Sequence, residues 1–126
     1  MRCAEVGRQM TGARSYQAGL AAEDQVAQLY DRSGRSVCAR RWRGSGGEID
    51  LIARDGSEVI FIEVKQSKTH AQAAEHLTPR QMARIYASAS EFLAGEPKGQ
   101  LTDVRFDVAL VDGMGRIEVL ENAYAA

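Results

Sequence analysis

Alternating apolar and polar side chains predict two adjoining strands in the middle of the chain. Residues 48–54 and 58–66 are rich in Ile, Val, Leu and Phe, as strands are. Side chains alternate across a strand, so one face of this hairpin is wholly aliphatic and must belong to the core. The residues of that face are Ile49, Leu51, Ala53, Ile60, Ile62 and Val64.

The sequence also predicts how the two strands pair. Asp55-Gly56 between them is typical of a two-residue hairpin turn. Such a turn would place Arg54 opposite Ser57 and make Asp50 and Glu63 diagonal neighbours, roughly 7–8 Å apart. A one-residue slip would bury charges in the aliphatic core, so the pattern favours this register or an equivalent four-residue loop.

The second face of the hairpin becomes ionic away from the turn. It carries Glu48 and Asp50 on one strand, and Glu63 and Lys65 on the other. Three carboxylates beside one ammonium repel one another unless a divalent cation completes the group, and Mg²⁺ takes such oxygen ligands. The alternative is an ordinary hairpin with a solvated charged face. The apolar run 59–62 favours a strand that is covered on both faces. Burying a charge in such a strand costs folding free energy, so a charge retained there is expected to be functional.

The remaining pattern predicts an α/β protein. We expect helices from residue 15 or 16 to 32 and from 79 to about 94, where Thr78 is the N-cap, Pro79 the first residue and Gln81 the capping-box residue. Three further strands are expected at 36–42, 103–111 and 116–120. The order α-β-β-β-α-β-β predicts a mixed β-sheet flanked by helices. Residues 1–14 are expected to be a flexible N-terminal arm, 15–126 a single domain, 43–47 a glycine-rich loop and 66–75 a segment of low order.

Glu23 lies in the middle of the apolar stripe of the first predicted helix. Leu20, Val26 and Tyr30 all fall within about 60° of it at 100° per residue. A buried glutamate without a partner is costly or protonated. Glu23 is therefore a candidate functional acid, unless it reaches water at the edge of the stripe or pairs with Lys65 or an arginine.

Composition excludes several classes of protein. No apolar run approaches the roughly 18 residues of a membrane span, and Cys3 and Cys38 form no disulfide or metal framework. We therefore expect a cytoplasmic protein that does not enter membranes. With two histidines, His70 and His76, a zinc site or a histidine triad is improbable.

The formal net charge of −1 is unevenly distributed along the chain. Residues 1–43 contain eight arginines and four acids, a net charge of +4. Five arginines fall within twelve positions here, Arg32, Arg35, Arg40, Arg41 and Arg43. With Trp42, this cluster is a candidate nucleic-acid contact, centred on residues 40–43, because arginines bind phosphates and tryptophan stacks on bases. It is equally consistent with the solvated edge of a strand.

These residues together resemble a known group of proteins. Asp50 followed by Glu63-Val64-Lys65, after a helical Glu23, resembles the PD-(D/E)xK nuclease superfamily, which includes restriction endonucleases and Holliday junction resolvases. The closer resemblance is to the YraN-type bacterial family UPF0102. It covers roughly residues 15–121 and is carried by these segments: Gly19 with Ala22-Glu23, residues 41–43, 47–52 and 61–65, Thr78-Pro79-Arg80, and Arg105-Phe106-Asp107-Val108.

The resemblance implies a restriction endonuclease-like core of three layers and a metal-dependent endonuclease. In that reading Asp50 and Glu63 bind Mg²⁺ or Mn²⁺, Glu23 completes the shell, and Lys65 orients or deprotonates the attacking water. Glu48 would stand behind the metal ligands, and Gln81 would either bond to the helix cap or contact substrate. DNA is the implied partner, branched or recombining DNA among its forms, and a homodimer is implied by junction-cutting relatives.

The chain departs from the family pattern at two positions. Ser67 and Gln81 stand where relatives often carry a basic residue. Both departures remove positive charge near the expected phosphate path, which weakens the case for tight DNA binding more than the case for a metal site. Two other readings therefore stand beside the enzyme. One is a non-catalytic nucleic-acid-binding module of the same fold, and the other is a protein-interaction domain in which the charges are structural.

Overall fold

The computed structural model describes residues 10–123, with side chains from residue 19 onward. A five-stranded sheet with the order β1-β2-β3-β4-β5 forms its centre, and only β3 and β4 pair in parallel. The elements are α2 (Met10–Arg32), β1 (Ser36–Gly44), β2 (Gly47–Asp55), β3 (Glu58–Gln66), α3 (His70–Ala74), α4 (Pro79–Leu93), the 3-10 turn η1 (Gly99–Leu101), β4 (Val104–Val111) and β5 (Ile117–Leu120). The predicted mixed sheet flanked by helices is thereby confirmed.

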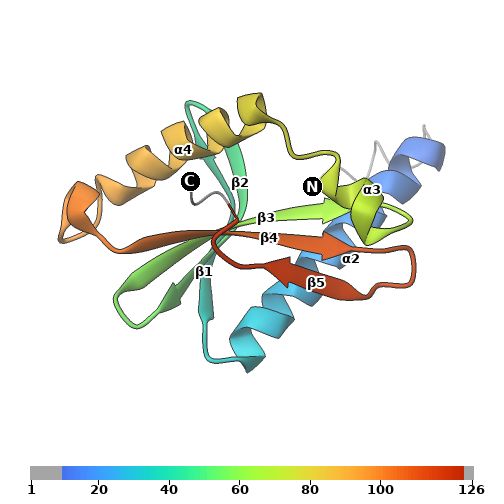
Figure 1. The fold of residues 1–126 in the computed structure, drawn as a ribbon, viewed down its shortest axis with the longest axis horizontal. Helices are drawn as coiled ribbons and strands as arrows, with labels where there is room; N and C mark the ends of the chain where they lie inside the picture. The colour runs from blue at the N-terminus through green and yellow to red at the C-terminus, as the bar shows by residue number, and fades with distance from the viewer. Residues whose placement is uncertain (1–9, 124–126) are drawn as a thin grey trace.

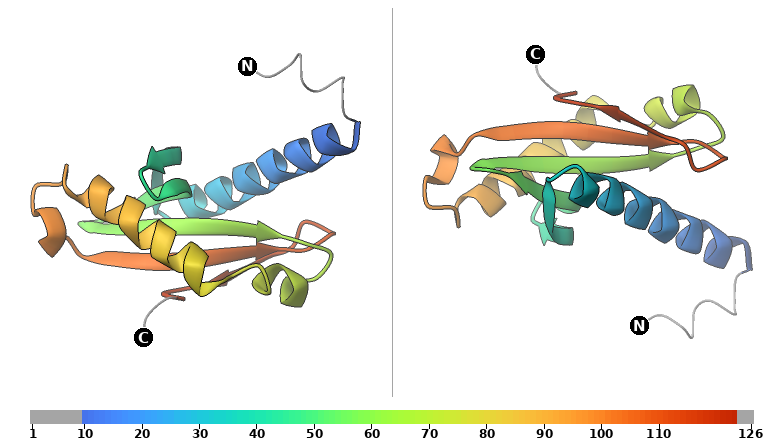
Figure 2. Two further views of the ribbon diagram at one scale, coloured as in Figure 1. Left: turned by 90° about the horizontal axis from the view of Figure 1, so that it is seen from above. Right: turned by 90° about the horizontal axis from the view of Figure 1, so that it is seen from below.

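Helices cover both faces of this sheet, which gives three layers (Figure 1). On one face, Val26 and Tyr30 of α2 pack on Leu51, Ile60 and Ile62. On the other face, Ala89 and Leu93 of α4 pack with residues of β2 and β3, and α3 covers part of β4. Figure 2 shows α4 in front of the sheet in one view and α2 in front in the opposite view. Within residues 10–123, none of the helices has the length and apolarity to cross a membrane.

Three predicted segments differ from the structure. Helix α2 begins at Met10, so residues 10–14 of the predicted arm are helical, whereas residues 1–9 lie outside the described part. Strand β1 continues to Gly44, and only Ser45-Gly46 separates it from β2. The segment expected to have low order contains α3, because the Thr69 side chain caps it and Ala73 is buried on β4.

The β2–β3 register differs from the predicted one by two residues. Asp55 pairs with Glu58 and Arg54 with Val59, so the turn is Gly56-Ser57 with Gly56 at a φ of 62°. Glycine at the first central position suits a type II′ hairpin turn. A shift of two residues preserves the face of every side chain within the ladder, and Asp50 and Glu63 are the next residues beyond its last pair, Leu51–Ile62.

The ladder between β2 and β3 ends at the pair Leu51–Ile62. Ile49 lies beyond this end, and it packs in the cluster beneath α4 with Ile52 and Phe61. The prediction that Ile49 shares a face with Leu51 is therefore wrong. Ile49 still pairs with Trp42 of β1, and both side chains belong to the cluster beneath α4, so strict alternation along β2 is broken between Leu51 and Ile49.

Helix α4 lies directly against the hairpin between β1 and β2. A Cβ atom at Gly46 would collide with the carbonyl oxygen of Arg84, and one at Gly44 would lie 2.7 Å from the Ser88 hydroxyl. Ser88 is fully buried and donates a hydrogen bond of 2.8 Å to the carbonyl oxygen of Gly47. The glycines of this segment therefore permit close approach of a helix, which fixes α4 beside the start of β2.

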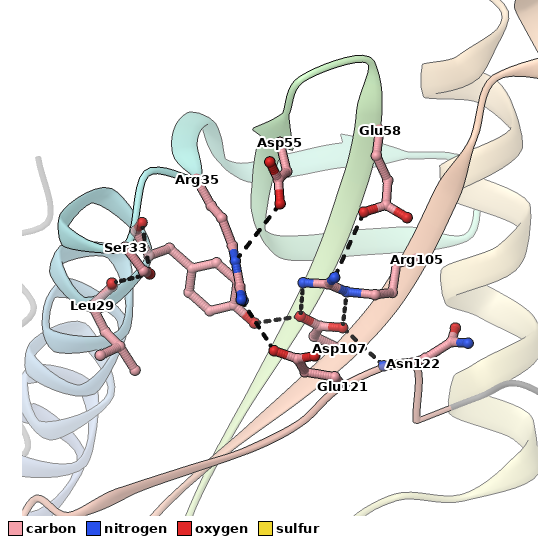
Figure 3. Close-up of polar contacts among 10 residues, drawn as sticks. Leu29, Ser33, Arg35, Asp55, Glu58, Arg105, Asp107, Glu121 and Asn122 are labelled. Carbon is pink, nitrogen blue, oxygen red and sulfur yellow. Dashed lines mark hydrogen bonds and ion pairs between the residues drawn. The ribbon is translucent and has the colours of Figure 1, made fainter.

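Asp107 of β4 connects three parts of the chain on the α2 face of the sheet (Figure 3). Its carboxylate accepts hydrogen bonds from the Tyr30 hydroxyl at 2.7 Å, from Arg105 Nε at 2.9 Å and from the backbone N–H of Asn122 at 3.0 Å. Asp107 is almost fully buried, so these bonds and the guanidinium compensate the desolvation of its charge. The contacts are structural and explain an Asp in the middle of an apolar strand.

We predict that Gly46→Ala destabilises the protein by about 1–3 kcal/mol, the usual cost of overpacking, because the new methyl group meets the α4 backbone. The control is Gly19→Ala in α2, where a Cβ meets nothing within 4 Å. That variant should be stabilised by up to about 1 kcal/mol through helix propensity. Urea unfolding measures both, and equal effects of the two substitutions would contradict the packing described here.

Candidate functional site

The candidate site lies where β2 and β3 separate. Asp50 and Glu63 are the first residues beyond the last pair of the ladder, Leu51–Ile62. The backbone N–H of Val64 donates to Asp50 Oδ2 at 2.8 Å. The Asp50 carboxylate thus accepts a hydrogen bond from the backbone of β3, which directs this carboxyl group toward that strand.

Glu63 is buried next to Asp50, with 7% of its surface exposed. Its Oε2 atom accepts a hydrogen bond of 2.8 Å from Gln81 Nε2 of α4 and lies 3.3 Å from Lys65 Nζ. Its Oε1 atom is buried and accepts no hydrogen bond when both acids are ionised, whereas a protonated Glu63 carboxyl hydrogen-bonds to Asp50. Such an unsatisfied oxygen is unusual in a folded protein and calls for an explanation.

The electrostatics of the site favour protonated carboxyl groups. Burial and then the charge of Asp50 raise the pKa of Glu63 to about 8. Burial also raises the pKa of Asp50, against the opposing effects of the Val64 N–H and the Lys65 ammonium. Two carboxyl groups this close do not both ionise readily, so the pair retains a proton near neutral pH when no cation is bound.

Glu23 reaches the same region from α2. Burial and then the charge of Asp50 raise its pKa to about 7, whereas Arg41 lowers it. The Arg41 Nε atom lies 3.5 Å from Glu23 Oε1. Arg41 has a φ of 48° in the middle of β1, a conformation that is rare for a residue other than glycine and is often found at functional sites. Of the alternatives left open for Glu23, the pairing with an arginine is the one observed.

The basic cluster of β1 is largely engaged with acids. Arg40 pairs with Asp24, and Arg43 Nη2 lies 2.8 Å from Glu48 Oε2. Glu48 therefore points to Arg43 at the exposed hairpin and acts on the site only through its charge.

The ring of Trp42 is engaged in packing within the protein. Its ring packs edge-on against Phe92 at 5.4 Å between centroids, inside the cluster beneath α4. Trp42 is partly buried there and shares this face with Ala39, three residues before it, so strict alternation along β1 is broken near the left-handed Arg41.

The arrangement fits a hard divalent cation bound by two carboxylates. Within residues 10–123, no three His, Cys, Asp or Glu side chains are grouped so as to hold a metal by themselves, so Glu23 does not complete a ready-made set of three ligands. Mg²⁺ is usually bound by one or two carboxylates, with waters and substrate oxygens in the other positions. Asp50 and the unsatisfied Glu63 Oε1 supply such a pair.

Sequence reasoning found the acids of the site but missed features that depend on tertiary packing. These are the left-handed backbone of Arg41, the direct bond from Gln81 to Glu63, and two exposed arginines of α4, Arg80 and Arg84. The N-cap and first turn of α4 were predicted correctly. The predicted helix therefore already placed Arg80 and Arg84 close to Gln81, and these two arginines could have been identified from the sequence.

We predict that Glu63→Gln costs little stability and removes a pH dependence. The raised pKa of Glu63 means that the folded state binds more protons than the unfolded state, so stability is lost as pH rises from about 4.5 to about 8. In EDTA, Glu63 alone should lower the wild-type unfolding free energy by up to about 1.4 kcal/mol per pH unit in this window. Glu63→Gln should lose this contribution, most clearly between pH 7 and 8, above the pKa of about 7 of Glu23, whereas the exposed control Glu75→Gln should retain it. A large fall in melting temperature of Glu63→Gln at pH 8 would contradict the prediction.

Comparisons with known proteins agree with the resemblance at the level of the family. The model of "Uncharacterised protein family UPF0102" matches residues 22–111. A UPF0102 protein of Cereibacter sphaeroides is 70% identical over 93% of this chain and all of its own length. Relatives from Ruegeria pomeroyi and Dinoroseobacter shibae are 61% and 46% identical over 90% and 91% of this chain, and 92% and 86% of their own lengths.

The matched region runs from α2 to the end of β4, and so contains Glu23, Asp50, Glu63, Lys65 and Gln81. The extent of the match and the identity of these relatives lead to one conclusion. The chain belongs to family UPF0102.

Proposed function

We propose that this protein is a metal-dependent endonuclease that hydrolyses phosphodiester bonds of DNA, with branched or recombining DNA among its substrates. The observation that carries the proposal is the buried, unsatisfied Oε1 atom of Glu63 beside Asp50, with the Lys65 ammonium 3.3 Å from the other Glu63 oxygen. Two carboxylates that can bind a cation and one lysine lie where the two strands separate. Such a set of groups can catalyse phosphodiester hydrolysis.

Asp50 and Glu63 would hold the cation, Mg²⁺ or Mn²⁺, and Glu23 would add negative charge from α2. A bound divalent cation supplies an activated water and neutralises charge on the phosphoryl oxygens. It would also compensate the carboxylate repulsion that raises the pKa of Glu63. The oxygen donors present are of the kind that these cations prefer.

Three other groups have roles that follow from their positions. Lys65 has a side chain that is 17% exposed, so its ammonium can reach a phosphate while remaining beside Glu63. It orients or deprotonates the attacking water and offsets charge on the phosphate. Gln81 fixes Glu63 through the bond to Oε2 and leaves Oε1 for the cation. The Val64 N–H fixes Asp50 in the same way.

The topology supports membership of the PD-(D/E)xK superfamily. Asp50 and Glu63-Val64-Lys65 lie on adjacent antiparallel strands, and α4 connects β3 to the parallel strand β4. A helix that carries Glu23 packs on the other face. This is the arrangement that the resemblance implies for a restriction endonuclease-like core.

The test is cleavage of branched, single-stranded and duplex DNA by the purified protein with Mn²⁺ or EDTA. We expect cleavage with Mn²⁺ alone, and a loss of more than about 100-fold in Asp50→Asn, beyond the 10–100-fold typical of groups that only support a ligand. Gln81→Ala should fall within that 10–100-fold range, because Gln81 positions Glu63.

The matched control is Asp24→Asn, an exposed acid of α2 that pairs with Arg40. It should cleave at the wild-type rate. Salt-sensitive DNA binding without cleavage would support the non-catalytic binding module instead. Cleavage that persists in Asp50→Asn would refute the assignment of the site.

A further inference from the structure

Two arginines project from the first turns of α4. Arg80 and Arg84 are both exposed. They are four residues apart on a helix, so their side chains are neighbours with Cβ atoms about 5–6 Å apart. Together they form a compact pair of positive charges at the amino end of a 15-residue helix, the end at which the helix dipole also favours anions.

This arginine pair, Arg80 and Arg84, lies next to the candidate site. Gln81 follows Arg80 directly, and its amide is 2.8 Å from Glu63. The backbone of Arg84 touches Gly46 in the hairpin between β1 and β2. At 100° per residue, Arg80 and Arg84 lie on the same side of the helix as Ser88, which contacts Gly44 and Gly47 of that hairpin. The pair therefore borders the site between α4 and the hairpin.

Among the side chains that the structure describes, no acid pairs with either of these two arginines. Within residues 10–123, neither guanidinium makes an ion pair. By contrast, Arg40, Arg41 and Arg43 each lie beside an acid. The positive charges of the arginines that the sequence favoured for phosphate binding are thus largely neutralised by acids. The arginines of α4 keep their positive charge available to a ligand.

The aromatic side chains around α4 are engaged in packing. Trp42 packs on Phe92, and Tyr86 packs edge-on against Phe106 with 4.8 Å between centroids. Proteins that bind single strands combine basic grooves with aromatic rings on which bases stack. Tyr86 lies two residues from Arg84 and is 43% exposed, but its ring is held edge-on against Phe106, which favours recognition through phosphates, as in duplex binding.

We infer that Arg80 and Arg84 bind backbone phosphates of a DNA duplex and thereby place one strand at Asp50 and Glu63. The inference rests on the proposed nuclease function, and assigns the substrate contact to α4 rather than to the arginines of β1. The contact is with phosphates, so it is independent of base sequence and strongly dependent on salt.

The experiment measures binding separately from cleavage. Fluorescence anisotropy with a labelled duplex, in EDTA and at about 50–200 mM salt, gives the slope of log K against log salt concentration for wild type, Arg80→Gln/Arg84→Gln and the control Lys98→Gln. Lys98 is an exposed cation beyond the opposite end of α4. The double variant should lose about 2 units of slope, about 1 for each phosphate contact, and the control none. Circular dichroism verifies that the variants are folded.

Each outcome decides the inference. An unchanged slope in the double variant overturns it and leaves the nuclease proposal intact. Absent duplex binding by wild type also overturns it, as does equal or tighter binding of the single strand of the same sequence. If the double variant loses slope but wild type does not cleave DNA with Mn²⁺, the phosphate contact stands and the catalytic proposal fails.

Discussion

A buried carboxyl group with one unsatisfied oxygen is the constraint on which the site depends. Lys65 and Gln81 both contact Oε2 of Glu63, so Oε1 is left without a partner. Strand β3 is apolar on either side, and its packing under two layers of helix prevents Glu63 from reaching water. Perturbed and unsatisfied groups of this kind concentrate at functional sites, and a cation between Asp50 and Glu63 would satisfy both.

The fold holds this arrangement from both sides of the sheet. Close packing of α4 on the glycines of the β1–β2 hairpin brings Gln81 to Glu63, and α2 brings Glu23 on the other face. The Asp107 network fixes α2 to β4, which provides the rigid support that a precise site requires. Arginines compensate Glu23 and Glu48, whereas Asp50 and Glu63 have one ammonium between them, so the two central acids remain available to a ligand.

Local pattern was sufficient to predict the strands and to bring Asp50 close to Glu63 and Lys65. Alternation survives an even shift in register only within the ladder, which ends before Asp50 and Glu63. The local pattern could not choose between Asp55-Gly56 and Gly56-Ser57 as the turn, since glycine is acceptable in either. The bond between Gln81 and Glu63 and the inward Trp42 depend on where α4 docks. Helix α3 was missed because it is only five residues long and Ala73 is its one buried residue.

The most direct test of the central claim is calorimetric titration of Mn²⁺ at pH 7 in buffers of different ionisation enthalpy. A cation bound by Asp50 and Glu63 must displace the proton that the pair retains. We expect binding accompanied by proton release, and loss of both in Glu63→Gln. Binding without proton release, or binding that survives the loss of the Glu63 carboxylate, would contradict the account.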